Sequence, residues 1–260
     1  MTQQTPQSIS GQERPKSEIA VEIGIAAEKV QFRLQVPTGP ATWEDLLPFM
    51  RALVKVSSDI AEEHFATRGQ KVSCRAGCGI CCRQQVPLAP FEAHRLRRLV
   101  DELPEPRRSE ITARFRDVEA RVKAAGLDDL IQGDSAGDLE SLHRSTGQYF
   151  RLMIPCPFLE DESCSIHDER PLKCREYLVT SPAEHCAEPE GGNVVGLPLP
   201  LRVYLTTLLM EGNSADDRPD WVPLNSLMSW TDSHKPQQTS RTGPELFQQF
   251  MSHLMQPNKG

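Results

Sequence analysis

Four cysteines crowd into one short segment of the chain, SCRAGCGICC at residues 73–82. Thiolates held this close repel one another strongly in a low dielectric, and a bound cation removes that penalty. Gly77 and Gly79 flank the second cysteine, and glycine permits backbone conformations that turn amide N–H groups toward thiolate or sulfide. The segment therefore predicts a metal centre, whose candidate ligands are Cys74, Cys78, Cys81 and Cys82.

The other four cysteines lie downstream, beyond a predicted helical insertion of 73 residues. They are Cys156, Cys164, Cys174 and Cys186. We expect folding to bring both sets of sulfur atoms into one neighbourhood, where all eight act as metal ligands. Cys81 and Cys82 are adjacent, so their side chains are expected to diverge. Cys82 then serves a second ion or a second corner of a cluster, or it is a small buried apolar residue.

The size of the chain and its first residues bear on how the cysteines are used. A chain of 260 residues buries most of its apolar surface without crosslinks. Residues 1–17 contain no apolar leader segment, and no stretch approaches the length of a membrane span, so we expect a cytoplasmic protein with no membrane partner. In that reducing compartment cysteines are metal ligands or catalytic groups more often than disulfides.

Charge argues against one class of partner. The formal net charge is −7, whereas nucleic-acid binding needs clustered Lys and Arg to neutralise phosphates. We therefore expect no nucleic-acid partner.

Apolar periodicity outlines the secondary structure. Residues 19–25 and 30–36 alternate apolar and polar side chains and predict a β hairpin. Residues 42–65 change to steps of three or four, which predicts a helix that begins near Pro48. Thr242 and Glu245 have the spacing of a capping box. Further helices are predicted over residues 91–100, 111–122, 135–153, 201–211 and 242–255, with a helical turn near 171–177.

These patterns predict a mainly α fold with one or two short β hairpins and with cysteine-rich metal-binding loops on a helical scaffold. We expect four regions along the chain. They are a disordered tail (1–17), an N-terminal hairpin and helix (18–68), a cysteine-cluster domain with a helical insertion (69–190), and C-terminal helices packed on it (191–260).

The identity of the metal is open between zinc and iron. Sulfur-rich ligation suits both zinc and iron–sulfur clusters. Zinc fingers use two CxxC-like pairs, whereas only the first set here is tightly spaced. Three clustered thiols joined by distant ones can hold a cubane, which favours an iron–sulfur cluster of the [4Fe–4S] type, with zinc as the alternative.

One further pattern points to an enzyme. Cys74, Cys78 and Cys81 have the spacing of the radical S-adenosylmethionine motif. Ile80 stands where that motif usually has an aromatic residue, and the chain lacks the alternating strands and helices of a barrel. This spacing alone leaves open whether the protein is an enzyme.

Several separate pieces occur in a fixed order between residues 74 and 186. They are CRAGCGICC, then Cys156-Pro157-Phe158-Leu159, Cys164, Arg170-Pro171 and Cys174-Arg175. In this combination the segment resembles the YkgJ-type cysteine-cluster family, whose members are described as zinc- or iron-chelating domains. It is also similar to the flagellin lysine methylase FliB, a longer relative thought to combine an iron–sulfur cluster with S-adenosylmethionine. The resemblance implies metal chelation rather than a particular reaction, and residues 190–260 show no recognisable methyltransferase module.

Charged residues around the second set of cysteines have two interpretations. Arg170 and Arg175, together with Lys173, are candidate cofactor-binding residues because cations stabilise an anionic cluster. The alternative is simple ion pairing with the neighbouring acids Asp168, Glu169 and Glu176.

We expect His167 to be a packing residue rather than a ligand. Four acidic residues could supply oxygen ligands to a hard cation, but we expect them to form a solvated turn instead. They are Glu160, Asp161, Glu162 and Asp168.

Three functions therefore remain open from the sequence. The first is an iron–sulfur protein acting in electron transfer, methyl transfer or protein modification. The second is a structural zinc protein whose thiols pin two loops to the scaffold for a protein partner. The third is a metal-handling protein with loosely held, exchangeable zinc or iron.

Overall fold

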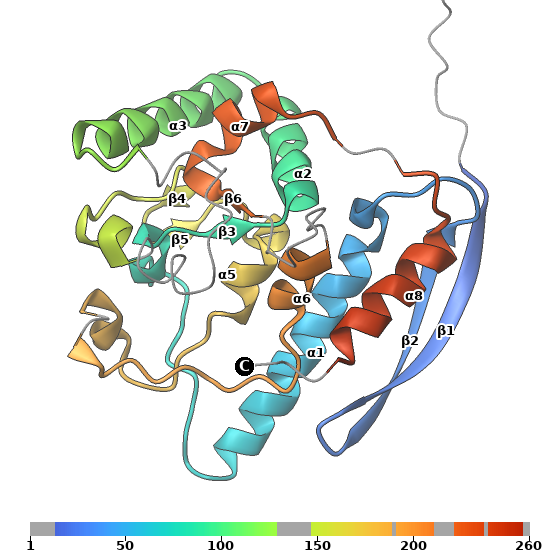
Figure 1. Cartoon of the computed structure of the whole chain (residues 1–260). Coiled ribbons are helices and arrows are strands. Elements are labelled where there is room, and N and C mark those ends of the chain that lie inside the picture. The colour runs from blue at the N-terminus through green and yellow to red at the C-terminus, as the bar shows by residue number, and fades with distance from the viewer. Residues whose placement is uncertain (1–13, 129–146, 189–190, 211–220, 237–238, 257–260) are drawn as a thin grey trace, which may run out of the picture.

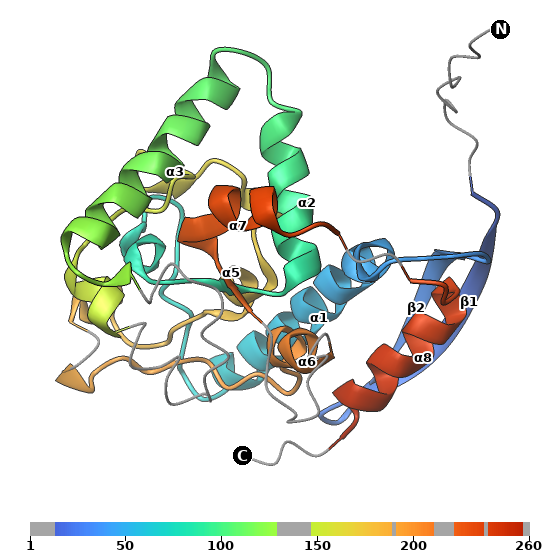
Figure 2. The same cartoon turned by 45° about the horizontal axis from the view of Figure 1, so that its top comes forward.

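The fold was analysed in a computed structural model, which describes residues 14–128, 147–188, 191–210, 221–236 and 239–256. Figure 1 shows a long β hairpin on one flank with helices α1 and α8 beside it, and helices α2, α3 and α7 gathered on the opposite flank. The second view in Figure 2 shows the same division. The mainly α fold with short hairpins is confirmed.

The hairpin joins strands β1 (Lys16–Ile25) and β2 (Glu28–Pro37) in an antiparallel register that pairs Ile23 with Val30. Side chains alternate between faces along each strand, because successive residues of a strand point in opposite directions. The inner face buries Ile23, Ile25, Phe32 and Val36, whereas acidic and basic pairs occupy the outer face. The predicted hairpin is therefore confirmed, and each strand is longer than expected.

The first apolar core lies between this hairpin and three helices: α1 (Leu47–Ala66), α6 (Val203–Met210) and α8 (Gly243–Leu254). Phe49 of α1 stands at its centre, with ring centroids 5.5 Å from Phe32 and 5.4 Å from Phe247. Pro48 occupies the first turn of α1, where proline leaves no helical hydrogen bond unmade. Thr242 and Glu245 form the predicted capping box at the start of α8.

The second core lies around α2 (Pro90–Asp101) and α3 (Arg107–Ala124), against α7 (Leu227–Ser233). A two-residue pairing joins β3 (Pro87–Leu88), which follows the first cysteine loop, to β6 (Val222–Pro223), which follows the second. The sequence predicted α2 and α3 but neither α7 nor this strand pair. Most of the predicted helix over 135–153 lies outside the described residues. Within the part that is described, residues 147–151 are helical.

Helix α5 (Leu172–Glu176) lies between the two cores and carries Cys174. Its first N–H group, on Leu172, donates 2.9 Å to the buried carboxylate of Glu92 on α2. Its last residue, Glu176, accepts a 2.8 Å bond from the N–H of Tyr204 at the start of α6. One carboxylate thus caps α5 and another caps α6, so the position of α5 is fixed from both sides.

A last short hairpin, β4 (Leu159–Glu160) with β5 (Ser163–Cys164), holds one more cysteine. It lies at the side of the molecule away from the long hairpin (Figure 1). None of the helices in the described ranges is both long and apolar enough to cross a membrane. The first core is shared by the predicted N-terminal and C-terminal regions. It combines the helices at residues 47–66, 203–210 and 243–254.

Candidate metal centre

Backbone contacts bring the two cysteine segments together. The N–H of Ser73 donates 2.9 Å to the carbonyl of Val179, and the N–H of Cys156 donates 2.7 Å to the carbonyl of Cys82. The N–H of Gly77 donates 3.2 Å to the hydroxyl of Ser163. The loop before the insertion is therefore bonded at three points to the segment after it, as the sequence required for a shared centre.

An ion pair strengthens this junction. Arg83, at the end of the 3₁₀ turn Ile80–Arg83, donates from both terminal nitrogens to the two carboxylate oxygens of Glu162, at 2.9 and 2.7 Å. The Arg83 guanidinium also donates 2.8 Å to the carbonyl of Gly79. Neither residue was predicted to act at the site, and no local pattern could have identified a pair separated by 79 positions.

The two glycines of the first loop have different roles. Gly77 adopts a φ of 79°, in the left-handed region that favours glycine. Gly79 has an ordinary φ of −93°, but a Cβ there would lie 2.7 Å from Leu159 and 2.6 Å from Glu162. Both of these contacts are with side-chain ends, and the nearest backbone atom, the Cα of Glu162, would lie 3.1 Å away. A methyl group there therefore displaces both side chains and crowds the β4–β5 hairpin.

We expect Gly79→Ala to destabilise the protein by about 1–3 kcal/mol, because the methyl group must push the β4–β5 hairpin away from the first loop. Chemical denaturation of the purified variant measures this loss. Gly24→Ala is the matched control, since a Cβ at that position of β1 meets no atom within 4 Å. Equal stability of the two variants would contradict the close approach.

All eight thiols are free, and they occupy one neighbourhood. On one side, Cys186 lies close enough to Cys74, Cys78 and Cys81 for their charges to raise its pKa further, beyond the rise that burial causes. On the other side, burial raises the pKa of Cys156, and the charges of Cys174, Cys164 and Cys81 add to it. The charge of Cys81 therefore acts on members of two sets of three thiols. The first set is Cys74, Cys78 and Cys186, and the second is Cys156, Cys164 and Cys174.

The adjacent pair departs from its prediction. The thiols of Cys81 and Cys82 stay close enough to interact, and this interaction is the largest cause of the raised pKa of Cys81, ahead of burial. They lie in the 3₁₀ turn Ile80–Arg83, where residues follow one another more tightly than in an extended loop. Cys82 is half-buried, so it remains within reach of the other sulfur atoms.

Burial keeps the deeper thiols protonated in the absence of a cation. It raises the pKa of the Cys174 thiol to about 12, and the charges of Cys81 and Cys164 act in the same direction. A metal binds the thiolate, so it must displace these protons, and its affinity rises with pH. As the side chains stand, no three Cys, His, Asp or Glu residues in the described ranges form a set that could hold a metal ion. The thiols therefore have to turn toward a centre when it binds.

Arg170 is the cation whose charge acts on thiols of both cysteine segments, whereas Arg175 acts on Cys164. Burial raises the pKa of Cys74, Cys164 and Cys174, and the positive charge of Arg170 opposes that rise in each of them. Its Nε atom is buried and has no hydrogen-bond acceptor in the described part of the chain. Leaving such a donor unpaired is costly. The orphaned N–H suits an acceptor that arrives with an anionic sulfur centre.

Arg175 and Lys173 have other surroundings. Arg175 donates 3.0 Å to the carbonyl of Arg170 and also to the carbonyl of Asp168, so it holds the loop that presents Arg170. The ammonium of Lys173 lies 4.8 Å from the ring centroid of Tyr204, a cation–π contact. The alternative of local ion pairs with neighbouring acids does not hold for Glu169, which pairs with the distant Arg51 and Arg95 instead.

The remaining sequence candidates lie at the surface. His167 is exposed, with 65% of its side chain accessible, so the expected packing role is wrong. Asp161 and Glu162 form the turn of the β4–β5 hairpin in left-handed conformations, as expected for a solvated turn. Glu160 in β4 pairs with Arg107 and Arg114 of α3.

Fold and site together define a cysteine-rich metal-binding protein on a helical scaffold. Residues 73–190 match the CxxCxxCC family, described as a "Putative zinc- or iron-chelating domain". This segment, which contains all eight cysteines, belongs to that cysteine-cluster family, so the resemblance noted in the sequence is confirmed. Comparisons with curated proteins and with solved structures found no match.

Proposed function

We propose that the cysteines of both segments hold an iron–sulfur cluster of the [4Fe–4S] type, which takes four of the eight thiols as ligands. The observation that carries this proposal is Arg170, whose buried Nε lacks an acceptor while its charge acts on thiols of both cysteine segments. A cluster with thiolate ligands is net negative, and its sulfides accept hydrogen bonds. Arg170 would supply both the compensating charge and a donor.

The number and placement of the thiols allow a polynuclear centre. One structural zinc ion and one cubane each take four cysteine ligands, and Cys81 together with either set of three cysteines supplies four. A cubane holds its cysteine sulfurs farther apart than one zinc ion does, because iron and sulfide fill the space between them. The choice of a cubane over zinc therefore rests on the charge and the buried N–H of Arg170.

Such a cluster supplies one-electron transfer when it is bound. The chain's own contribution is to exclude water and fix charge: α5 buries Cys174 between the two cores, and Arg175 holds the loop of Arg170. In residues 191–260, helices α6, α7 and α8 are built into the two cores and act as scaffold. Electron transfer, rather than methyl transfer, is therefore the activity that we propose.

Anaerobic purification tests this proposal. We expect a brown protein with an absorption band near about 400 nm and with iron and acid-labile sulfide in equal amounts. Elemental and sulfide analysis measure both. Colourless protein that contains zinc, without iron or sulfide, would refute the cluster and leave a structural or exchangeable zinc site.

Arg170→Gln tests the observation behind the proposal. The variant should fold but hold a cluster with a more negative reduction potential, because the reduced cluster loses a nearby positive charge. His167→Gln, in the same loop but exposed, is the matched control and should leave the potential unchanged. Equal potentials in Arg170→Gln and the parent protein would remove Arg170 from the site.

A further inference from the structure

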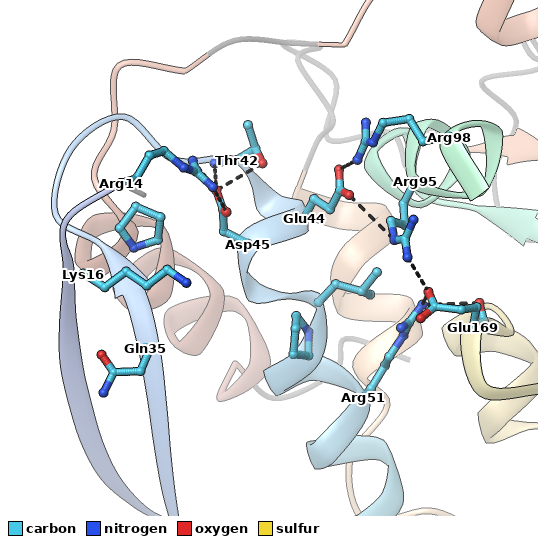
Figure 3. A pocket seen from close by; sticks show the side chains of 13 residues that line it. Arg14, Lys16, Gln35, Thr42, Glu44, Asp45, Arg51, Arg95, Arg98 and Glu169 are labelled. Atoms are coloured by element: carbon cyan, nitrogen blue, oxygen red, sulfur yellow. Dashed lines mark hydrogen bonds and ion pairs between the residues drawn. The ribbon is translucent and has the colours of Figure 1, made fainter. Parts of the chain in front are cut away.

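A pocket of about 530 Å³ lies outside the cysteine cluster, at the junction of four chain segments. The long hairpin contributes Arg14, Lys16 and Gln35, and the start of α1 contributes its first turn with Arg51. Two arginines of α2 and Glu169 close the remaining side (Figure 3). Its volume falls within the range of about 300–1,000 Å³ that is typical of small-ligand sites.

The charge of the pocket lining opposes that of the whole chain. Five cations line the pocket against three carboxylates, although the formal net charge of the chain is −7. The cations are Arg14, Lys16, Arg51, Arg95 and Arg98, and the carboxylates are Glu44, Asp45 and Glu169. Four of the five cations are arginines, whose planar forks match carboxylate and phosphate oxygens.

The three carboxylates are already shared among the arginines. Glu169 pairs with both Arg51, at 3.0 Å, and Arg95, at 3.1 Å. Glu44 is also shared, between Arg95 and Arg98. The arginines on this side of the pocket therefore carry more N–H donors than these two carboxylates can accept.

Across the pocket, Asp45 is equally occupied. It pairs with Arg14 and accepts a 2.8 Å bond from the backbone N–H of Thr42. Lys16 extends from β1 toward the space between the two groups (Figure 3), and no ion pair to it is present in the described part of the chain. Leu47 and Pro48 bring the positive end of the helix dipole of α1 to the same lining.

We propose that this pocket binds a small ligand with at least two negative charges on phosphate or carboxylate oxygens. The ligand would take N–H donors of the lining arginines that the carboxylates leave unused and the ammonium of Lys16, between the two groups of ion pairs. The lining holds two more positive than negative charges, so a dianion balances it. The site is separate from the proposed cluster, since none of the eight cysteines lines it.

Calorimetric titration of the full-length protein tests the pocket with pyrophosphate and with citrate, at constant ionic strength because salt screens such contacts. We expect at least one of them to bind with a Kd below about 1 mM, and acetate to show no binding in the same range. Pyrophosphate binding more tightly assigns a phosphate-bearing ligand, and citrate binding more tightly assigns a polycarboxylate.

Lys16→Gln is the informative variant because Lys16 is exposed and its loss breaks no ion pair of the network. It should weaken binding about tenfold while leaving the thermal unfolding temperature unchanged. Lys29→Gln is the matched control, since Lys29 is an exposed lysine of β2 that pairs with Glu22 outside the pocket. An unchanged Kd in Lys16→Gln, or no binding of either anion up to about 10 mM, would overturn the proposal.

Discussion

Replacing Cys174 by alanine is expected to remove the bound metal and to lower the melting temperature by about 10 °C or more. Cys174 lies on α5, a helix of five residues that is too short to be stable without tertiary contacts. A bond from metal to this sulfur would join α5 to the first cysteine loop, and the free energy of metal binding is also free energy of folding. Metal analysis and thermal unfolding measure the two effects.

Ile166→Val is the matched control for that experiment. Ile166 packs against the same core as Cys174 and loses a similar volume without losing a sulfur atom. It should cost about 1 kcal/mol and leave the metal content unchanged. If Cys174→Ala retained the full metal content, Cys174 would not be a ligand, and the loss of stability would be one of packing alone.

Local signals account for the parts of the fold that could be predicted. The alternation along β2, Pro48 at the start of α1 and the capping box at Thr242 act within a few residues, so the sequence displays them directly. The β3–β6 pair could not be predicted, because each strand has two residues and the pairing spans more than 130 positions. Helix α7 is also too short, at seven residues, to show a period.

The candidate metal centre also has parts that the sequence could predict and parts that it could not. The density of cysteines predicted a metal centre, and the structure brings both sets of thiols around Cys81. Their supports could not be predicted, since Arg83 with Glu162 and Glu92 with Leu172 are contacts between distant segments. The choice of Arg170 over Arg175 also needed the structure. Among the described residues, the buried Nε of Arg170 has no acceptor, whereas Arg175 donates to carbonyls.

Glu92 is the most costly of these supports, because it is a carboxyl group inside the protein. It is 3% exposed, and one of its oxygens has no hydrogen-bond partner in the described structure. Burial raises its pKa to about 7, against the opposing effects of the Leu172 N–H and the charges of Arg51 and Arg175. The folded protein therefore keeps a proton on Glu92 at pH values where the unfolded chain has released it.

The expected result is a loss of stability as pH rises. Between its ordinary pKa of 4.5 and the folded value of about 7, the folded state binds the extra proton, so the unfolding free energy falls with increasing pH. At about 1.4 kcal/mol per pKa unit, the loss between pH 5 and pH 8 is about 3 kcal/mol. Glu92→Gln keeps an oxygen for the N–H of Leu172 but has no proton to lose.

Urea denaturation of both proteins at the two pH values measures this difference. Glu92→Gln should be close to the parent protein in stability at pH 5 and more stable than it at pH 8, because only the parent must ionise a buried group. Glu176 also titrates in this range, because burial raises its pKa to about 7 and the charge of Glu92 adds to that rise. The difference between the two proteins therefore reports Glu92 together with its effect on Glu176. Glu102→Gln, at an exposed position just after α2, should follow the parent at both pH values. Parallel pH profiles for Glu92→Gln and the parent would show that Glu92 is ionised in the fold, with the helix dipole of α5 and the two arginines outweighing burial.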